Sequence, residues 1–363
     1  MDIYKPGIGI AAGSYMLKWN ALDQYVRNNQ LQFMPNDNVN IFINFECIIK
    51  NLSLNREIIS LVTYHKQNVV IELESAILNL AAQYKGYFRK EKCNPKIYFY
   101  YTDLKSTDPQ QMKIYNKFYR SYYKNEYLKN PTFKMMGELL TDIIIPEVEL
   151  IISYIPDCYF IKSKTFDGSI IPTIVSLLPD YQNYKNVIVS GDVFDTLYMF
   201  NPNFMVIYIK RRFKYFNVET TIPGVIQSIV KNESPFDLNI FGSEMYFRLL
   251  LSIKGSKIRN IRSAKGFGYG RFMKILADGI KNDVVLKDFE SLGSIINLFP
   301  EKYQDDITNA FKCMSIDTQY QLINNVDTEY IKSQIVDKID ITSVEALNNK
   351  RFLDFPINLS MLV

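Results

Sequence analysis

Short apolar segments alternate with helix-forming segments through the first 212 residues, and this alternation constrains the fold more than any other feature. Buried strands are predicted over residues 38–44, 95–103, 157–163, 186–192 and 204–210. Helices are predicted between them, over residues 70–89, 108–130, 134–154 and 167–178. Strands joined by helices need crossover connections, so the pattern predicts an α/β fold with a mainly parallel, doubly wound sheet.

The same patterns divide the chain of 363 residues into four expected parts. Residues 1–38 are predicted to be an irregular N-terminal extension, and residues 39–212 carry the sheet. Beyond residue 212 the pattern becomes helical, which predicts a helical subdomain over 213–284 and a mostly helical C-terminal region over 285–363.

Composition excludes several classes of function. The four cysteines form no CxxC pair and His65 is the only histidine, so a zinc site of Cys and His ligands and a Ser-His-Asp mechanism are not expected. The thiols are expected to be reduced and buried. The first residues lack the charged-then-apolar pattern of a leader, and no apolar run reaches about 20 residues, so neither a leader nor a membrane partner is expected. The net charge is only +4, so nucleic-acid binding would depend on local patches.

Polar and acidic residues follow the predicted strands. They are the segment 44–46, Thr102 with Asp103, the turn at Asp167, and the segment 190–192. The carboxyl ends of parallel strands meet at one edge of a sheet, where ligand sites of such folds lie. Carboxylates gathered there would suit a metal ion, but Asp and Asn after a strand also cap helices. The residues alone leave both interpretations open.

A glycine-rich basic turn is the strongest binding signal. Between Lys254 and Lys274 the chain has seven cations and no acid, and a GFGYG segment precedes an apolar helix. Exposed N–H groups at glycines, the positive end of the helix and the cations together suit phosphate. The alternative is a solvated basic loop. The residues assigned to phosphodiester binding here are Lys254, Lys257, Arg259, Arg262, Lys265, Gly266, Gly268, Gly270, Arg271 and Lys274.

With these features the chain resembles the 5′→3′ exonucleases and flap endonucleases, especially the phage RNase H-type members. Five motifs agree in order over about residues 40–280: the strand end 43–45, the segment 117–125 (KFYRSYYKN), the turn 166–170, the strand end 189–194 and the segment 255–270. The resemblance implies a PIN-like, flap-nuclease-like sheet domain, with a helix-three-turn-helix subdomain followed by C-terminal helices. It also implies that Arg120 and Lys124 grip a DNA strand.

The acids of the family are largely missing at the matching positions. The first-strand aspartate is Asn44, and the second-strand aspartate falls on Thr102, with Asp103 one step out of register. One step along a strand reverses the side-chain direction. Ile170 and Phe194 replace two further acids.

In the helix-three-turn-helix, Ser256 and Arg259 stand where the family has acids. The remaining carboxylates are Asp103, Asp167, Asp192 and Asp195, with Asp195 one position past the family's acid. The family clamps two metal ions with such groups, and ligands that act together are not separable residue by residue. No residue is therefore assigned as catalytic, and no metal or cofactor is expected. Mg²⁺ would enter only if cleavage were retained.

The favoured hypothesis is a viral or phage protein that binds DNA backbone without cutting it. A second is a virion structural or assembly component that contacts other viral proteins. A third is an active Mg²⁺-dependent nuclease with a rearranged site that includes Glu46. The protein is expected in the host cytoplasm or in the virion. Tyrosines of the segment 108–130 could stack on bases or simply pack within the fold.

Overall fold

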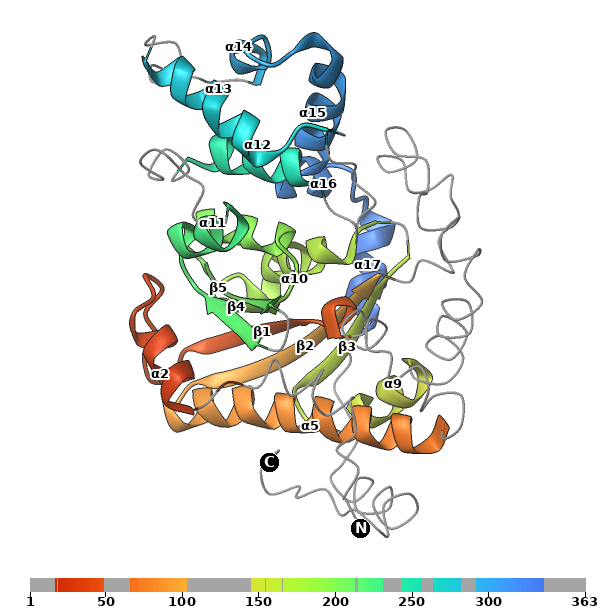
Figure 1. Cartoon of the computed structure of the whole chain (residues 1–363). Coiled ribbons are helices and arrows are strands. Elements are labelled where there is room, and N and C mark those ends of the chain that lie inside the picture. The colour runs from red at the N-terminus through yellow and green to blue at the C-terminus, as the bar shows by residue number, and fades with distance from the viewer. Residues whose placement is uncertain are drawn as a thin grey trace.

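A six-stranded sheet lies at the centre of the molecule, with the strand order β3-β2-β1-β4-β5-β6 (Figure 1). The structure is a computed structural model. The structure describes residues 17, 19–48, 66–102, 145–153, 155–164, 166–212, 215–230, 243–255, 264, 266–281 and 292–335.

The sheet is mostly parallel, as the sequence predicts. The strands are β1 (Asn38–Asn44), β2 (Asn94–Thr102), β3 (Cys158–Ser163), β4 (Lys185–Ser190), β5 (Phe204–Arg212) and β6 (Tyr215–Glu219). The first five pair in parallel, whereas β6 runs antiparallel to β5. The expectation that the pattern turns helical directly after residue 212 was wrong, because the β-favouring segment YFNVE extends the sheet first.

Strand β1 shows why the sheet is buried on both faces. From Val39 to Asn44 every residue of the strand is buried. Ile41 and Ile43 belong to one apolar core and Phe42 belongs to the other, because successive side chains point to opposite faces. A near-continuous apolar run is typical of a parallel strand covered on both sides.

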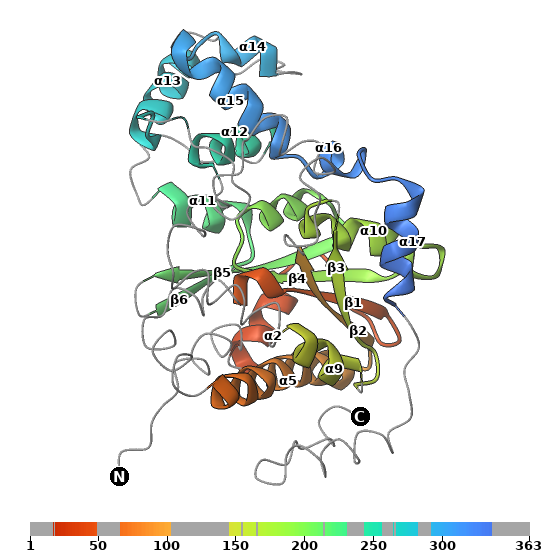
Figure 2. The ribbon, with the colours of Figure 1, turned by 90° about the vertical axis from the view of Figure 1, so that its right-hand side faces the viewer.

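Helices cover the two faces of the sheet. One face carries α2 (Trp19–Arg27), α5 (Lys66–Lys90) and α9 (Ile145–Ser153), and the other carries α10 (Ile171–Leu177) and α11 (Ile222–Val230) (Figures 1 and 2). The prediction of an irregular segment over 1–38 was wrong for α2, whose Leu22 and Val26 are buried in the core. The predicted helix 134–154 is described only as α9 and residues 134–144 lie outside the described residues.

The described residues include three 3-10 helices, η2 (Gly168–Ile170), η3 (Pro179–Tyr181) and η4 (Phe194–Phe200). Helix η2 follows β3 and η4 follows β4 at the carboxyl ends of these strands, whereas η3 lies between α10 and the start of β4. The predicted helix 167–178 is therefore divided into η2 and α10, with Pro172 at the start of α10, where its missing N–H is tolerated.

A helical unit stands above the sheet in Figure 1. It contains α12 (Glu244–Lys254), α13 (Tyr269–Lys281), α14 (Leu292–Ile296) and α15 (Glu301–Cys313). The chain then returns along the sheet domain through α16 (Ile316–Tyr320) and α17 (Asn325–Ser333) (Figure 2). There the Gln334 amide bonds both the backbone N–H and the C=O of Lys162, at 2.8 and 3.0 Å, and so covers the edge strand β3.

All four cysteines are free and buried, as expected. No helix in the described part of the chain is long and apolar enough to cross a membrane.

Candidate functional site: the strand ends and the start of α13

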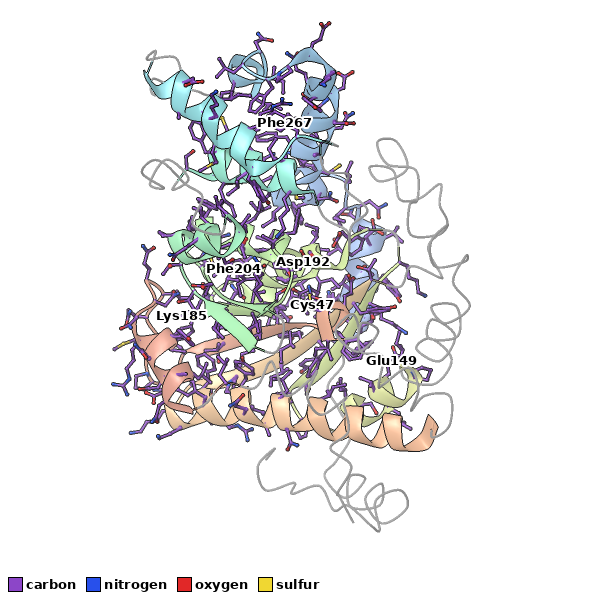
Figure 3. The ribbon with its side chains drawn as sticks, in the orientation of Figure 1. Cys47, Glu149, Lys185, Asp192, Phe204 and Phe267 are labelled. Atoms are coloured by element: carbon purple, nitrogen blue, oxygen red, sulfur yellow. The ribbon has the colours of Figure 1, made fainter. Side chains whose placement is uncertain are left out.

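The carboxyl ends of β1, β2 and β4 meet around one buried carboxylate. The Asp195 Oδ2 atom accepts hydrogen bonds from Asn44 Nδ2 at 2.7 Å, from the Tyr100 hydroxyl at 2.7 Å and from Ser190 Oγ at 2.5 Å. Asn44, Tyr100, Ser190 and Asp195 are each at most 1 % exposed. We call these four residues the strand-end cluster. Figure 3 labels Cys47 and Asp192, close neighbours of the cluster, between the sheet and the helical unit.

Neighbouring bonds fix the direction of each donor in the strand-end cluster. The Cys47 backbone N–H donates to Asn44 Oδ1 at 3.2 Å, so the amide must turn its Nδ2 toward Asp195. Ser190 Oγ accepts the Asp192 backbone N–H at 3.0 Å, which leaves its own hydrogen for Asp195. The strand-end cluster therefore presents three hydrogens to one carboxylate oxygen.

Burial also keeps the Tyr100 proton in place. Removal from water, followed by the negative charge of Asp195, raises the pKa of the Tyr100 hydroxyl well above its ordinary value. The Tyr100 hydroxyl therefore keeps its proton at neutral pH and donates it in the hydrogen bond to Asp195 Oδ2.

Asp167 and Asp192 bond the backbone beside them. Asp167 Oδ1 accepts the Ser169 N–H at 2.8 Å and forms the N-cap of η2. Asp192 Oδ1 accepts the Phe194 N–H at 3.0 Å, just before η4. Both aspartates are buried. Both thus accept a backbone N–H two residues further along the chain, and Asp167 makes the cap that strand-end aspartates commonly make.

Thr102, at the end of β2, also makes hydrogen bonds with both its backbone and its side chain. Thr102 N–H donates to Glu46 Oε1 at 2.8 Å, and Thr102 Oγ1 accepts the Gly168 N–H at 2.9 Å. A side chain at Gly168 would meet this hydroxyl at 2.9 Å, so the close approach requires glycine. Asp103, the next residue after β2, lies outside the described residues.

The start of α13 is exposed, in contrast to the buried residues at the strand ends. Gly266, Gly268 and Gly270 are exposed, whereas the alternating aromatic residue Phe267 is buried. The Phe267 ring packs on Tyr303 and Phe299, with ring centroids 5.0 and 5.7 Å away. The aromatic ring anchors the turn to α15 and the loop before it, and the glycine backbone faces outward.

Two cations extend this surface along α13. Arg271 and Lys274 are exposed, and a Cβ atom built at Gly268 or Gly270 meets nothing within 4 Å. Open space over a glycine allows a ligand to approach the backbone closely. We call the segment 266–274 the α13 turn. Lys254 ends α12 on the other side of the loop and is partly buried.

Several predicted binding residues cannot be placed on this surface. Lys257, Arg259, Arg262 and Lys265, and also Arg120 and Lys124 of the predicted clamp helix, lie outside the described residues.

Comparison with solved structures gives the fold. The T5 5′-exonuclease with bound zinc ions matches with a TM-score of 0.50 and 11 % identity, over 82 % of this chain and 98 % of that chain. A bacteriophage T5 D15 flap endonuclease complex with DNA and metal ions gives 0.49, at 11 % identity and the same coverage. The Rad2 catalytic core with DNA gives 0.39, at 10 % identity, over 95 % of this chain and 97 % of that one.

The fold is that of a 5′→3′ exonuclease or flap endonuclease. The resemblance found in the sequence is thus confirmed for the fold. No protein-family model and no curated protein matches the chain.

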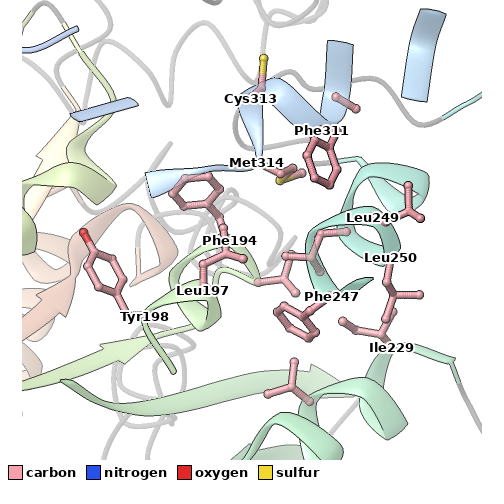
Figure 4. Close-up of a cluster of buried hydrophobic side chains, with 14 of the residues drawn as sticks. Phe194, Leu197, Tyr198, Ile229, Phe247, Leu249, Leu250, Phe311, Cys313 and Met314 are labelled. Atoms are coloured by element: carbon pink, nitrogen blue, oxygen red, sulfur yellow. The ribbon is translucent and has the colours of Figure 1, made fainter. Parts of the chain in front are cut away.

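The described residues do not fit the metal cluster that the flap-nuclease fold implies. Within them, no group of three or more His, Cys, Asp or Glu side chains is placed to hold an ion. Ile170 and Phe194, which the sequence resemblance places at family acid positions, are fully buried in the apolar core. Figure 4 shows Phe194 beside Leu197 of η4 and Met314, in a cluster that also holds Phe247 of α12. A magnesium ion needs oxygen ligands, which these side chains do not have.

Sequence reasoning did not identify Tyr100, Ser190 or Cys47 as neighbours of Asp195. Tyr100 is separated from Asp195 by 95 residues, and the two meet because β1 pairs with both β2 and β4. One signal was available. Tyr98 and Tyr100 alternate along β2, so a tyrosine hydroxyl close to the strand end was predictable from the period of two.

Proposed function

We propose that this flap-nuclease-fold protein binds the sugar-phosphate backbone of DNA and does not cut it. The α13 turn carries the proposal. Its exposed glycines leave the backbone open at the first turn of a helix of 13 residues, and two exposed cations follow within one and a half turns.

Physical chemistry makes this arrangement suitable for phosphate. The first N–H groups of a helix have no partner within the helix and carry its positive dipole end. A phosphate seated at Gly268 and Gly270 would accept those N–H groups, and Arg271 and Lys274 would reach the same or the next phosphate. These contacts read no base edge, so binding is expected to be independent of sequence and sensitive to salt.

The second part of the proposal, the absence of cleavage, is supported by the strand ends. In-line hydrolysis with divalent ions requires a set of carboxylates that face one space. Here Asp195 is bonded to Asn44, Tyr100 and Ser190. Asp167 caps η2, and Asp192 accepts the Phe194 N–H. Because these carboxylates make hydrogen bonds within the chain, they support the proposal that the protein retains the fold without metal-dependent cleavage.

Fluorescence anisotropy tests the binding, with labelled single-stranded, nicked-duplex and flap DNA at low and physiological salt. The double variant Arg271→Glu/Lys274→Glu is expected to lose about 10- to 100-fold in affinity. The matched control is Lys92→Glu/Lys332→Glu, which changes the net charge equally at exposed lysines next to α5 and on α17, away from α13. Equal losses in the two variants, or no binding by the unaltered protein, would contradict the proposal.

Cleavage is tested separately on the same flap DNA. The protein is incubated with Mg²⁺ or Mn²⁺, and Asp195→Asn serves as the control. No product is expected from either protein. Products that disappear in the variant would show an active nuclease with a rearranged site. Incorporation into a virion stays a proposal, checked by a fixed stoichiometry of the chain in purified particles.

A further inference from the structure

One buried carboxylate joins four segments of the chain. Asp195 belongs to η4, and its three donors belong to the ends of β1, β2 and β4. We propose that the strand-end cluster is a structural clamp that fixes these four segments by hydrogen bonds alone, in place of the divalent ions that the fold implies. The proposal does not depend on DNA binding, because its test measures only stability.

The hydrogen bonds support a clamp that excludes a cation from Asp195 Oδ2. Asn44 Nδ2, the Tyr100 hydroxyl and Ser190 Oγ all point hydrogens at Asp195 Oδ2. An ion beside this oxygen would face those hydrogens, which carry positive partial charge. Reversal of the Asn44 amide would not help, because its Nδ2 would then oppose the Cys47 N–H.

The clamp extends beyond the three donors. Ser190 Oγ accepts from the Asp192 N–H, and it lies 3.8 Å from the Cys47 thiol. Cys47 in turn donates its backbone N–H to Asn44. The bonds thus link the turn after β1 to the turn after β4. Members of such a closed network restrain one another, and loss of one bond leaves another buried group unsatisfied.

Burial explains why the donors are needed. Asp195 is completely buried, and a buried carboxylate is strongly destabilising unless hydrogen bonds replace its water. In a metal-binding site the cation would supply this compensation. Here two hydroxyls and one amide supply it, and Asn44 adds no second negative charge.

Two tyrosines on one strand give a matched test of the clamp. Tyr98 and Tyr100 lie on the same face of β2 and both are at most 1 % exposed. The Tyr98 ring stacks on Phe42 and Tyr159, and its buried hydroxyl interacts with Tyr181 and not with Asp195. Phenylalanine removes a buried hydroxyl at either position. Tyr98→Phe removes one that interacts with a neutral tyrosine, and Tyr100→Phe removes one that donates to Asp195.

Thermal unfolding of the unaltered protein, Tyr98→Phe and Tyr100→Phe is measured in EDTA, in millimolar Mg²⁺ and in millimolar Mn²⁺. Tyr100→Phe is expected to lower the Tm by about 2 to 4 °C, and Tyr98→Phe by about 1 °C or less. The Tm of the unaltered protein is expected to be the same in all three solutions. If Tyr100→Phe does not accumulate as a folded protein, Ser190→Ala removes another donor of the same oxygen.

Two outcomes would overturn the clamp. The first is an equal Tm for the two tyrosine variants, which would show that the bond to Asp195 contributes nothing. The second is a rise of several degrees in Mg²⁺ or Mn²⁺ that is lost in Asp195→Asn, which would show that an ion binds this carboxylate.

Discussion

The strand-end cluster buries its polar groups, whereas the α13 turn exposes its glycines and two cations. In the cluster every polar side chain is buried and is directed at another side chain of the chain itself. In the α13 turn the aromatic Phe267 is buried, while the glycines and two cations are exposed to solvent. One region is closed upon itself, and the other remains open to a ligand.

This difference shows which part of a nuclease fold can survive the loss of single residues. A pair of metal ions needs its whole set of carboxylates, and the effects of such residues are strongly non-additive. Phosphate binding at a helix start rests on backbone N–H groups, which no substitution except proline removes. We therefore expect the fold to lose metal chemistry abruptly and to lose phosphate binding gradually.

The largest expected effect comes from a second carboxylate in the cluster. Asn44→Asp would place two negative charges where the Asn44 amide now donates to Asp195 at 2.7 Å, in a fully buried site. Like charges in such a site are strongly unfavourable. We expect the free energy of unfolding in EDTA to fall by about 3 kcal/mol or more, as measured by urea denaturation.

An exchange of the two side chains is the control for this prediction. Asn44→Asp/Asp195→Asn restores one carboxylate and one amide in contact, so it should recover more than half of the lost stability. A single variant as stable as the unaltered protein would show that the cluster tolerates two charges. An exchange variant no better than the single one would show that the remaining donors require a carboxylate at position 195.

The second effect belongs to the α13 turn. Each phosphate contact releases a counterion from DNA, so the slope of log K against log salt reports the number of contacts. Arg271→Ala/Lys274→Ala should reduce that slope by about 2, at a loss of about 1 to 3 kcal/mol in binding free energy. Tyr100→Phe, measured at a temperature where it stays folded, should leave the slope unchanged. A change in the slope for Tyr100→Phe would show that the two regions are coupled.

The sequence predicts much of the sheet and little of the cluster. The β1 and β5 segments are apolar runs bounded by turns, so both strands were predicted within two residues of their observed ends. The direction of the Asp195 side chain was harder to predict. It stands one position past the family's acid, and in a strand that shift would turn its side chain away. Residues 194–200 form a 3-10 helix instead, and the Asp195 carboxylate reaches Asn44.

The missed elements have physical causes too. Strand β6 has only five residues, and its pairing with β5 in an antiparallel arrangement cannot be inferred from periodicity. Helix α2 has a polar exposed face, and it is held to the sheet domain by Leu22 and Val26. For the α13 turn, the sequence indicated the glycines and cations but not which of them are exposed, because that depends on how Phe267 packs on Tyr303.

The third effect tests the backbone of the α13 turn. Gly266 has a φ of +80°, a region that a residue with a Cβ atom adopts only at a cost. Gly266→Ala should lower the free energy of unfolding by about 1 to 2 kcal/mol, measured by urea denaturation. Space is not the cause, because the nearest atom to the added Cβ is the Tyr303 hydroxyl at 3.7 Å. Unchanged stability would mean that the turn relaxes to another conformation.

The smallest effect separates stability from binding at a single position. Gly270 lies in the first turn of α13 with nothing within 4 Å of an added Cβ, so Gly270→Ala should increase stability by about 0.5 kcal/mol through helix propensity. If a phosphate rests against this backbone, the same methyl group keeps it away, and DNA affinity should fall by about 3- to 10-fold. Higher stability with unchanged affinity would place the phosphate elsewhere. Higher stability together with lower DNA affinity would identify Gly270 as a position where the backbone is kept open for a ligand. A turn that binds nothing would gain helix stability from alanine and would lose no affinity.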